Sequence, residues 1–156
     1  MTHKIKLLVM DVDGTLTDGK IYIGSQGELM KAFHVKDGYA IAHMLPEMGI
    51  EPVIITGRAS EIVRHRAREL GIRELHQGAG RKLEVLERVL RKYRISFENV
   101  AYIGDDINDL ECIVRCGISG CPADAVDTVK DKVQYICKNS GGNSAVREFI
   151  EWLQIQ

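Results

Sequence analysis

Six short apolar runs with strand character alternate along the chain with segments of helical period. The runs cover residues 5–10, 52–56, 74–77, 100–104, 118–121 and 133–136. Continuous apolar strands separated by amphipathic helices are typical of βαβ units, whose parallel sheet is covered by helices on both faces. The alternation therefore predicts an α/β fold with a doubly wound, mainly parallel sheet.

The helical segments are expected at about residues 37–48, 60–70, 81–93, 107–116 and 144–153. Gly49, Gly71 and Gly117 directly follow three of them, where a left-handed C-cap favours glycine. Residues 20–34 interrupt the alternation, because two short apolar runs flank a Ser-Gln-Gly-Glu turn there. This segment predicts a small β-hairpin inserted after the first strand.

Composition narrows the class of protein. The 156 residues suit one domain, and we expect a single domain over 1–156. The formal net charge of -1 provides no basic field for nucleic acid. The first apolar run is too short to span a membrane and leads straight into Asp11 and Asp13, so no membrane partner is expected. Four cysteines without metal-ligand spacing predict free, buried thiols and a cytoplasmic location.

Polar side chains stand where the predicted strands end. In an open α/β sheet, ligands bind beyond the carboxyl ends of the strands. The residues at or just after these ends are Asp11, Asp13, Thr56, Gly57, Arg58, Lys82, Asp105, Asp106 and Asp109. We expect them to converge on one edge of the sheet.

Clustered carboxylates repel one another unless a cation neutralises them, and a set of oxygen ligands suits Mg²⁺. Asp11, Asp105 and a backbone carbonyl near Asp13 could hold this ion. A carboxylate can attack a phosphoryl group, which is the role expected of Asp11, and Asp13 could serve as acid and base. The Thr56 hydroxyl, the Gly57 amide and the Lys82 ammonium could then stabilise the phosphoryl oxygens.

Each of these signals is weak alone. An Asp-Gly turn after a strand is commonplace, and a lysine on a helix is usually solvated. The acids at Asp105, Asp106 and Asp109 could cap a helix and complement its dipole, but that explains one of them and not three. The set as a whole, with each member at a strand end, favours phosphoryl-group chemistry.

The motifs DVDGTLTDG, IITGR, Lys82 and IGDDIND resemble, in order, the four motifs of the haloacid dehalogenase superfamily of phosphatases. The resemblance implies a nucleophile at Asp11, an acid/base at Asp13 and a metal ligand at Asp105. It also implies phosphate binding by Thr56 and Lys82. Asp106 and Asp109 match acids that support the metal shell or orient the lysine.

Three further segments resemble the capless subgroup that includes 3-deoxy-D-manno-octulosonate 8-phosphate phosphatases: FHVKDGYAI, TGRASEIVRHRARELGI and SGGNSAVREFIEWL. The resemblance implies an enzyme of lipopolysaccharide biosynthesis without a cap domain, and a homotetramer in which hairpins shield the site. Two positions depart from the subgroup: Arg81 stands where aspartate is common, and Ser144 where glycine is usual.

A sugar-acid phosphate also carries a carboxylate, which a guanidinium can bind bidentately. Arg58 and Arg66 are the candidates for this contact, although most arginines on such a helix are merely solvated. A nonulosonate 9-phosphate, derived from KDN or N-acetylneuraminate, is an alternative substrate. The alternatives of another class are a receiver-like phosphoacceptor switch and a degenerate homologue that serves in assembly.

Overall fold

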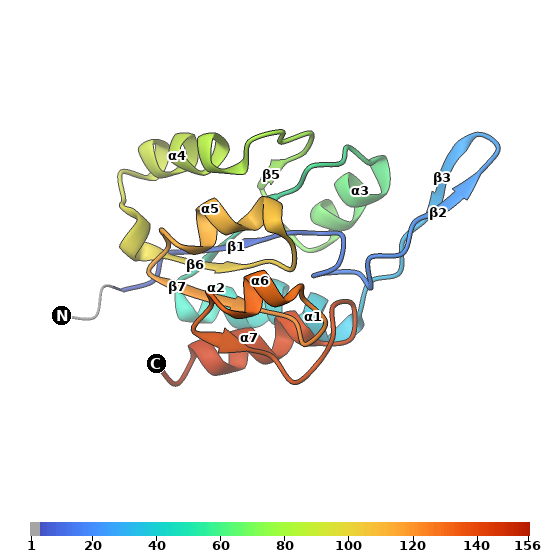
Figure 1. Cartoon of the computed structure of the whole chain (residues 1–156). Coiled ribbons are helices and arrows are strands. Elements are labelled where there is room, and N and C mark those ends of the chain that lie inside the picture. The colour runs from blue at the N-terminus through green and yellow to red at the C-terminus, as the bar shows by residue number, and fades with distance from the viewer. Residues whose placement is uncertain (1–3) are drawn as a thin grey trace.

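A six-stranded parallel sheet forms the centre of the computed structural model, which describes residues 4–156 (Figure 1). The strands are β1 (Leu7–Met10), β4 (Glu51–Ile55), β5 (Glu74–His76), β6 (Val100–Ile103), β7 (Ile118–Cys121) and β8 (Tyr135–Ile136). Their order is β5-β4-β1-β6-β7-β8. The chain winds outward from β1 to β5, returns, and then winds outward from β6 to β8. The predicted doubly wound α/β fold without a cap domain is therefore confirmed.

This order makes β1 and β6 the two strands that flank the topological switch point, where open α/β sheets bind their ligands. The two strands are in register, with Leu7 opposite Val100 and Met10 opposite Ile103. Asp11 and Asp105 follow these paired strands on the chain. The topology therefore places two acids from distant parts of the sequence beside each other.

Helices cover both faces of the sheet, because alternate strand residues point to opposite faces. Leu8 and Met10 pack with α3 (Glu61–Glu69), α7 (Ala145–Leu153) and the helical segment at 35–48. Leu7 and Val9 pack instead with α4 (Lys82–Tyr93), α5 (Leu110–Ile113) and α6 (Asp127–Lys130). Figure 1 shows α4 and α5 on one side of the sheet and α7 on the other. All four strand residues of β1 are buried, as the continuous apolar run predicted.

The hairpin is confirmed as a separate two-stranded sheet of β2 (Tyr22–Gly24) and β3 (Gly27–Met30). Gly27 has a φ of 113°, which its place in the turn requires and which only glycine adopts readily. The hairpin projects from the body of the molecule (Figure 1). Three apolar side chains on it are largely exposed: Ile23, Leu29 and Met30.

Two helix predictions need correction. The helix expected at 37–48 starts earlier and is divided into α1 (Val35–Tyr39), a π-helical turn (Ala40–Met44) and α2 (Leu45–Met48). The Leu45 amide there donates to Ala40 O, five residues back. Pro46 follows at once and has no amide hydrogen to donate, so the turn before it must adjust. The helix expected at 107–116 is a 3₁₀ turn (Ile107–Asp109) followed by α5, which ends at Ile113.

The C-cap prediction holds for two of the three glycines. Gly49 and Gly71 have φ values of 70° and 71°, whereas Gly117 does not adopt a positive φ. At Gly117, glycine is needed for close packing instead, because a Cβ there would lie 2.4 Å from Glu98 O. All four cysteines are free and buried, as predicted. No helix within residues 4–156 is long and apolar enough to cross a membrane.

Candidate active site

Asp11 lies at the carboxyl end of β1, with its side chain almost completely buried. Its amide donates to Ile103 O of β6 at 3.2 Å, which fixes the backbone at the switch point. The chain then turns sharply, because the amides of Thr15, Leu16 and Thr17 all donate to Val12 O. This tight turn sets the first carboxylate at the edge of the sheet.

Asp105 follows β6 and packs directly against the turn after β1. A Cβ on Gly14 would lie 1.9 Å from Asp105 Oδ2, so the carboxylate occupies space that any larger residue would fill. Gly14 also has a φ of 91°. Thr15 Oγ1 donates to Asp105 Oδ1 at 3.3 Å. The glycine of the DVDG motif is therefore required both for its conformation and for the approach of Asp105.

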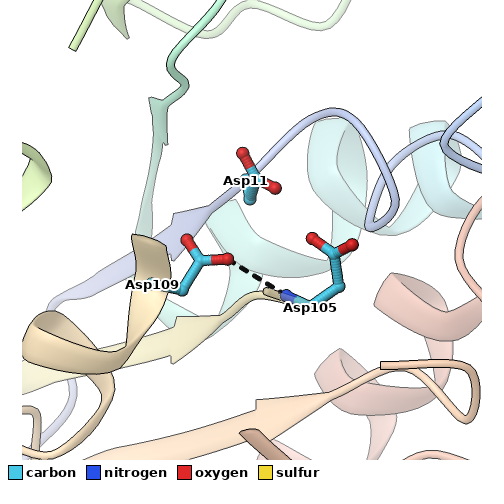
Figure 2. A group of neighbouring side chains, drawn as sticks. All are labelled: Asp11, Asp105 and Asp109. Atoms are coloured by element: carbon cyan, nitrogen blue, oxygen red, sulfur yellow. Dashed lines mark hydrogen bonds between the residues drawn. The ribbon is translucent and has the colours of Figure 1, made fainter. Parts of the chain in front are cut away.

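Asp11, Asp105 and Asp109 form a cluster in which one carboxylate oxygen from each lies within 4.8 Å of the others. Figure 2 shows the three carboxylates gathered at the ends of β1 and β6. This cluster is the only such group of possible metal ligands found among residues 4–156. It meets the condition on which the proposed chemistry depends, namely that Asp11 and Asp105 can share a cation.

Asp109 differs from the other two acids because its hydrogen-bonding capacity is already taken up. Its Oδ1 accepts from Lys82 Nζ at 2.8 Å and from Tyr102 OH at 2.6 Å. Its Oδ2 accepts from the amides of Asp105 and Asp106, at 3.1 and 3.3 Å (the first is the dashed line of Figure 2). Four donors on one buried carboxylate suit a residue that orients its neighbours rather than one that binds a metal ion.

Lys82 begins α4 and places its ammonium between two acids. Nζ lies 2.8 Å from both Asp11 Oδ1 and Asp109 Oδ1, and the side chain is only 1% exposed. Burial by itself would lower the pKa of Lys82, but the charges of Asp11 and Asp109 outweigh it and the pKa is raised. Lys82 is therefore held as a cation at the edge of the sheet.

The two acids at the switch point are electrostatically strained in the absence of a cation. Burial, followed by the charge of Asp109, raises the pKa of Asp11. Burial, followed by contact with Asp11, raises the pKa of Asp105 to about 8. A bound divalent cation would relieve both effects, since it favours ionised carboxylates. The all-oxygen donor set and this unrelieved repulsion fit a hard cation such as Mg²⁺.

Thr56 and Gly57 follow β4, the strand that pairs with β1 on the side opposite to β6. Thr56 is buried, and its backbone is fixed by bonds from its amide to His76 O and from the Ala79 amide to its carbonyl. Gly57 is exposed, and a Cβ there would meet only Ala79 O at 3.9 Å. The protein itself thus does not require glycine at this position.

The two arginine candidates are placed differently. Arg58 is half-exposed, and its Nη2 lies 3.7 Å from Glu28 Oε2 on the hairpin. Arg66 bonds Glu69 on its own helix at 3.1 Å and lies over the Phe33 ring at 5.5 Å. The Arg58 side chain therefore lies against the hairpin, whereas the contacts of Arg66 are with α3 and the segment after the hairpin.

The Asp13 and Asp106 side chains lie outside the acid cluster. Asp106 is exposed and caps the 3₁₀ turn, accepting from the Ile107 amide at 2.7 Å. Asp13 Oδ1 accepts from Lys31 Nζ at 2.6 Å. Sequence reasoning missed Lys31. The available signal was a single charged residue inside the otherwise apolar run LMKAF.

Comparison with known proteins identifies the family. A model described as haloacid dehalogenase-like hydrolase matches residues 72–150. The chain is 44% identical over 151 residues to the 3-deoxy-D-manno-octulosonate 8-phosphate phosphatase KdsC of Escherichia coli K12, covering 97% of this chain and 80% of that protein. The chain belongs to the haloacid dehalogenase-like hydrolases. The predicted resemblance to phosphatases of this superfamily is confirmed.

Solved structures of the family share the whole fold. The phosphatase from Yersinia pestis superposes with a TM-score of 0.93 at 42% identity, covering 97% of this chain and 81% of that one. The enzyme from Moraxella catarrhalis, solved with a magnesium ion, a phosphate ion and KDO, superposes with a TM-score of 0.92 at 41% identity. That match covers 97% of this chain and 86% of the other. The prediction that the chain is a phosphatase is therefore confirmed, which argues against a degenerate assembly module.

Proposed function

We propose that this haloacid dehalogenase-like hydrolase removes phosphate from 3-deoxy-D-manno-octulosonate 8-phosphate, with Mg²⁺ and through an aspartyl-phosphate on Asp11. The observation that carries the proposal is the meeting of Asp11, Asp105 and Lys82 at the switch point. The substrate rests on the relatives, several of which are phosphatases for this sugar acid.

In the first step, an oxygen of Asp11 attacks phosphorus while the bond between phosphorus and the sugar oxygen breaks. Asp13 gives its proton to that leaving oxygen. In the second step, Asp13 takes a proton from water, which attacks the aspartyl-phosphate and releases inorganic phosphate. Splitting the displacement in this way replaces one difficult step by two easier ones.

The remaining side chains bind and orient. Lys82 holds one oxygen of Asp11 and adds positive charge beside the phosphoryl group. The Thr56 hydroxyl and the Gly57 amide donate to phosphoryl oxygens. Asp11, Asp105 and the Asp13 backbone carbonyl would hold Mg²⁺, which screens the negative charge between the carboxylate and the phosphate. Asp109 keeps Lys82 in place, and Asp106 stabilises the turn that carries Asp109.

Arg58, and less directly Arg66, are proposed to bind the carboxylate of the sugar acid. We also propose a homotetramer, as the resemblance to the capless subgroup implies. The exposed apolar side chains Ile23, Leu29 and Met30, on a hairpin with little core beneath it, support a covering partner surface. Four free cysteines support the expected cytoplasmic location.

The test is a comparison of phosphate release, with and without Mg²⁺, from octulosonate 8-phosphate, a nonulosonate 9-phosphate and p-nitrophenyl phosphate. The proposal expects the octulosonate ester to give the largest kcat/KM and chelation to abolish turnover. Faster hydrolysis of the nonulosonate ester would change the proposed substrate but leave the proposed mechanism intact. A phosphoenzyme that lasts for minutes would instead support the receiver-like switch, and no preference over the aryl ester would refute both sugar substrates.

A further inference from the structure

Lys31 occupies an unusual position for a lysine on a projecting hairpin. It directly follows β3, between Met30 and Ala32, both of which are exposed. Its own side chain, however, is only 2% exposed. A lysine at such a place could extend into water, and burying an ammonium is costly unless it is paired. The partners of Lys31 must therefore explain why it turns inward.

Those partners are two carboxylates from different segments. Nζ lies 2.6 Å from Asp13 Oδ1, eighteen residues earlier, and 3.2 Å from Glu28 Oε2 on the hairpin itself. The Asp13 side chain is 20% exposed and the Glu28 side chain 17%. The ammonium thus bridges the hairpin to the turn that follows Asp11.

Glu28 is in turn fixed from the body of the protein. Ser60 Oγ, at the N-cap of α3, donates to Glu28 Oε1 at 2.5 Å, and Arg58 lies nearby. Partial burial opposes ionisation of Glu28, but the hydrogen bonds from Ser60 and Lys31 outweigh it and the pKa is lowered. Glu28 is therefore a charged, anchored partner that holds Lys31 in place. Because the Ser60 contact already ties the hairpin to α3, the bond to Asp13 is not needed as a tether.

We infer that Lys31 is a positioning residue that sets the orientation of Asp13 for proton transfer to the leaving oxygen. The inference rests on the proposed function, in which Asp13 is the acid and base. An ammonium only donates hydrogen bonds, so the Asp13 oxygen that accepts from Lys31 is the less favourable carrier of the transferable proton, and Oδ2 is left free to carry it. It passes from Oδ2 to the sugar oxygen as the bond to phosphorus breaks, and a proton from water returns to the same oxygen in the second step.

Orientation of the acid matters in proportion to how much the leaving group needs a proton. A sugar alkoxide must be protonated as it leaves, whereas p-nitrophenolate is stable without a proton at neutral pH. Loss of a well-placed general acid costs on the order of 10²-fold in rate where the proton is needed. Lys31 should therefore influence the two kinds of ester very differently.

The experiment measures kcat and KM of Lys31→Met on octulosonate 8-phosphate, a primary alkyl phosphate and p-nitrophenyl phosphate. We expect kcat on the two alkyl esters to fall on the order of 10²-fold and kcat on the aryl ester to fall less than about 3-fold. Lys31→Arg, which can still donate to Asp13, should recover most of the loss. Lys20→Met removes an exposed lysine near the hairpin and should change kcat on neither kind of ester.

Equal losses on the alkyl and aryl esters, with an unchanged melting temperature, would overturn the inference, since they would indicate only a general loss of positive charge. If Lys31→Met does not fold, the ratio of kcat on the alkyl esters to kcat on the aryl ester is measured with Lys31→Gln and Lys31→Arg. An equal loss on both kinds of ester in both variants also overturns the inference. Wild-type protein that hydrolyses the simple alkyl ester but not octulosonate 8-phosphate would refute the proposed substrate. The inference on Lys31 would then stand or fall on the simple ester.

Discussion

On one side of the site, Asp11, Lys82 and Asp109 are held by the central sheet and the start of α4, and all three are at most 5% exposed. On the other side, Lys31 after the hairpin bridges Asp13 and Glu28, and the Arg58 side chain is 51% exposed. The first side is fixed by the packing of the core. The second depends on polar contacts to an insertion that has almost no core of its own.

The difference matches what each side is proposed to do. Forming and breaking the bond to phosphorus needs groups that are preorganised in a dry environment, where their charges act most strongly. Holding a sugar acid needs an open face that can admit and release a large polar molecule. Substitutions on the buried side should therefore affect chemistry, and should also affect folding where they remove the main partner of a buried charge. Substitutions on the hairpin side should affect kinetics alone.

The strongest test of the buried side is Asp11→Asn. The amide keeps the shape of the side chain but is not a competent nucleophile, so turnover should fall by about 10³-fold or more. The fold should persist, because the substitution also removes one of the repelling charges. Phosphate release with Mg²⁺ and circular dichroism measure the two effects. A near-normal rate in the folded variant would refute the aspartyl-phosphate mechanism.

Asp109→Asn should cost both stability and rate. It removes the charge that pairs Lys82 within the core, so we expect a loss of about 2–4 kcal/mol in the free energy of unfolding and a fall in kcat on the order of 10²-fold. Urea unfolding and steady-state kinetics check the two numbers. Asp127→Asn, an exposed acid in the first turn of α6, is the matched control and should change neither. A stable but slow Asp109→Asn variant would show that the two properties separate on the buried side.

The burial of Asp105, together with its contact with Asp11, predicts how stability depends on pH. The pKa of Asp105 rises from 3.8 to about 8 on folding, so the folded state binds more protons between these values. In chelator, stability should therefore fall as the pH rises from about 5 to 8, by roughly 5 °C in melting temperature. Mg²⁺ should remove most of this slope by binding the ionised acids. Asp105→Asn should flatten the dependence of melting temperature on pH in chelator. An unchanged dependence would contradict the assignment of this slope to Asp105.

Arg58→Ala tests the hairpin side through substrate binding. Losing a rim guanidinium should raise KM for octulosonate 8-phosphate by about 10-fold and leave KM for p-nitrophenyl phosphate unchanged, because the aryl ester has no carboxylate. The melting temperature should not move. Arg64→Ala is the matched control, since the Arg64 side chain is 53% exposed and the Arg58 side chain 51%. Equal KM changes for both esters would mean that Arg58 acts on the phosphate instead.

The same division explains what sequence could reveal. The buried side was predictable because continuous apolar strands fix a parallel sheet, and residues such as Asp11 and Asp105 that follow its strands must then share an edge. The hairpin was also predictable from its turn. Its contact with the site was not, because nothing in local propensity tells which way the long Lys31 side chain will turn. The role of Asp109 was open between metal support and lysine orientation until its four donors could be counted.

Local irregularities were beyond sequence reasoning for a similar reason. The periodicity of residues 37–48 indicated a helix, and only the backbone reveals that one turn before Pro46 becomes a π-turn. Gly117 carries the same sequence signal as Gly49 and Gly71, yet its reason is the nearby carbonyl of Glu98. At Gly117 a tertiary contact, not a local preference, decided the case, whereas at 40–44 the proline that follows adjusts the turn.

Ser144→Gly should have the smallest effect, and it tests the scaffold behind the buried side. The Gly142 amide in this tail donates to Thr15 O in the turn after Asp11, and Ser144, two residues later, adopts a left-handed φ of 71°. Glycine removes that strain but also gains freedom when unfolded, so a net stabilisation of about 0.5 kcal/mol is expected, with kinetics unchanged. Ser140→Gly, in the same segment but without a positive φ, should destabilise slightly. If Ser144→Gly instead slowed turnover, the strained tail would help to align Asp11. The position of Asp11 would then depend on the tail as well as on the packing of the core.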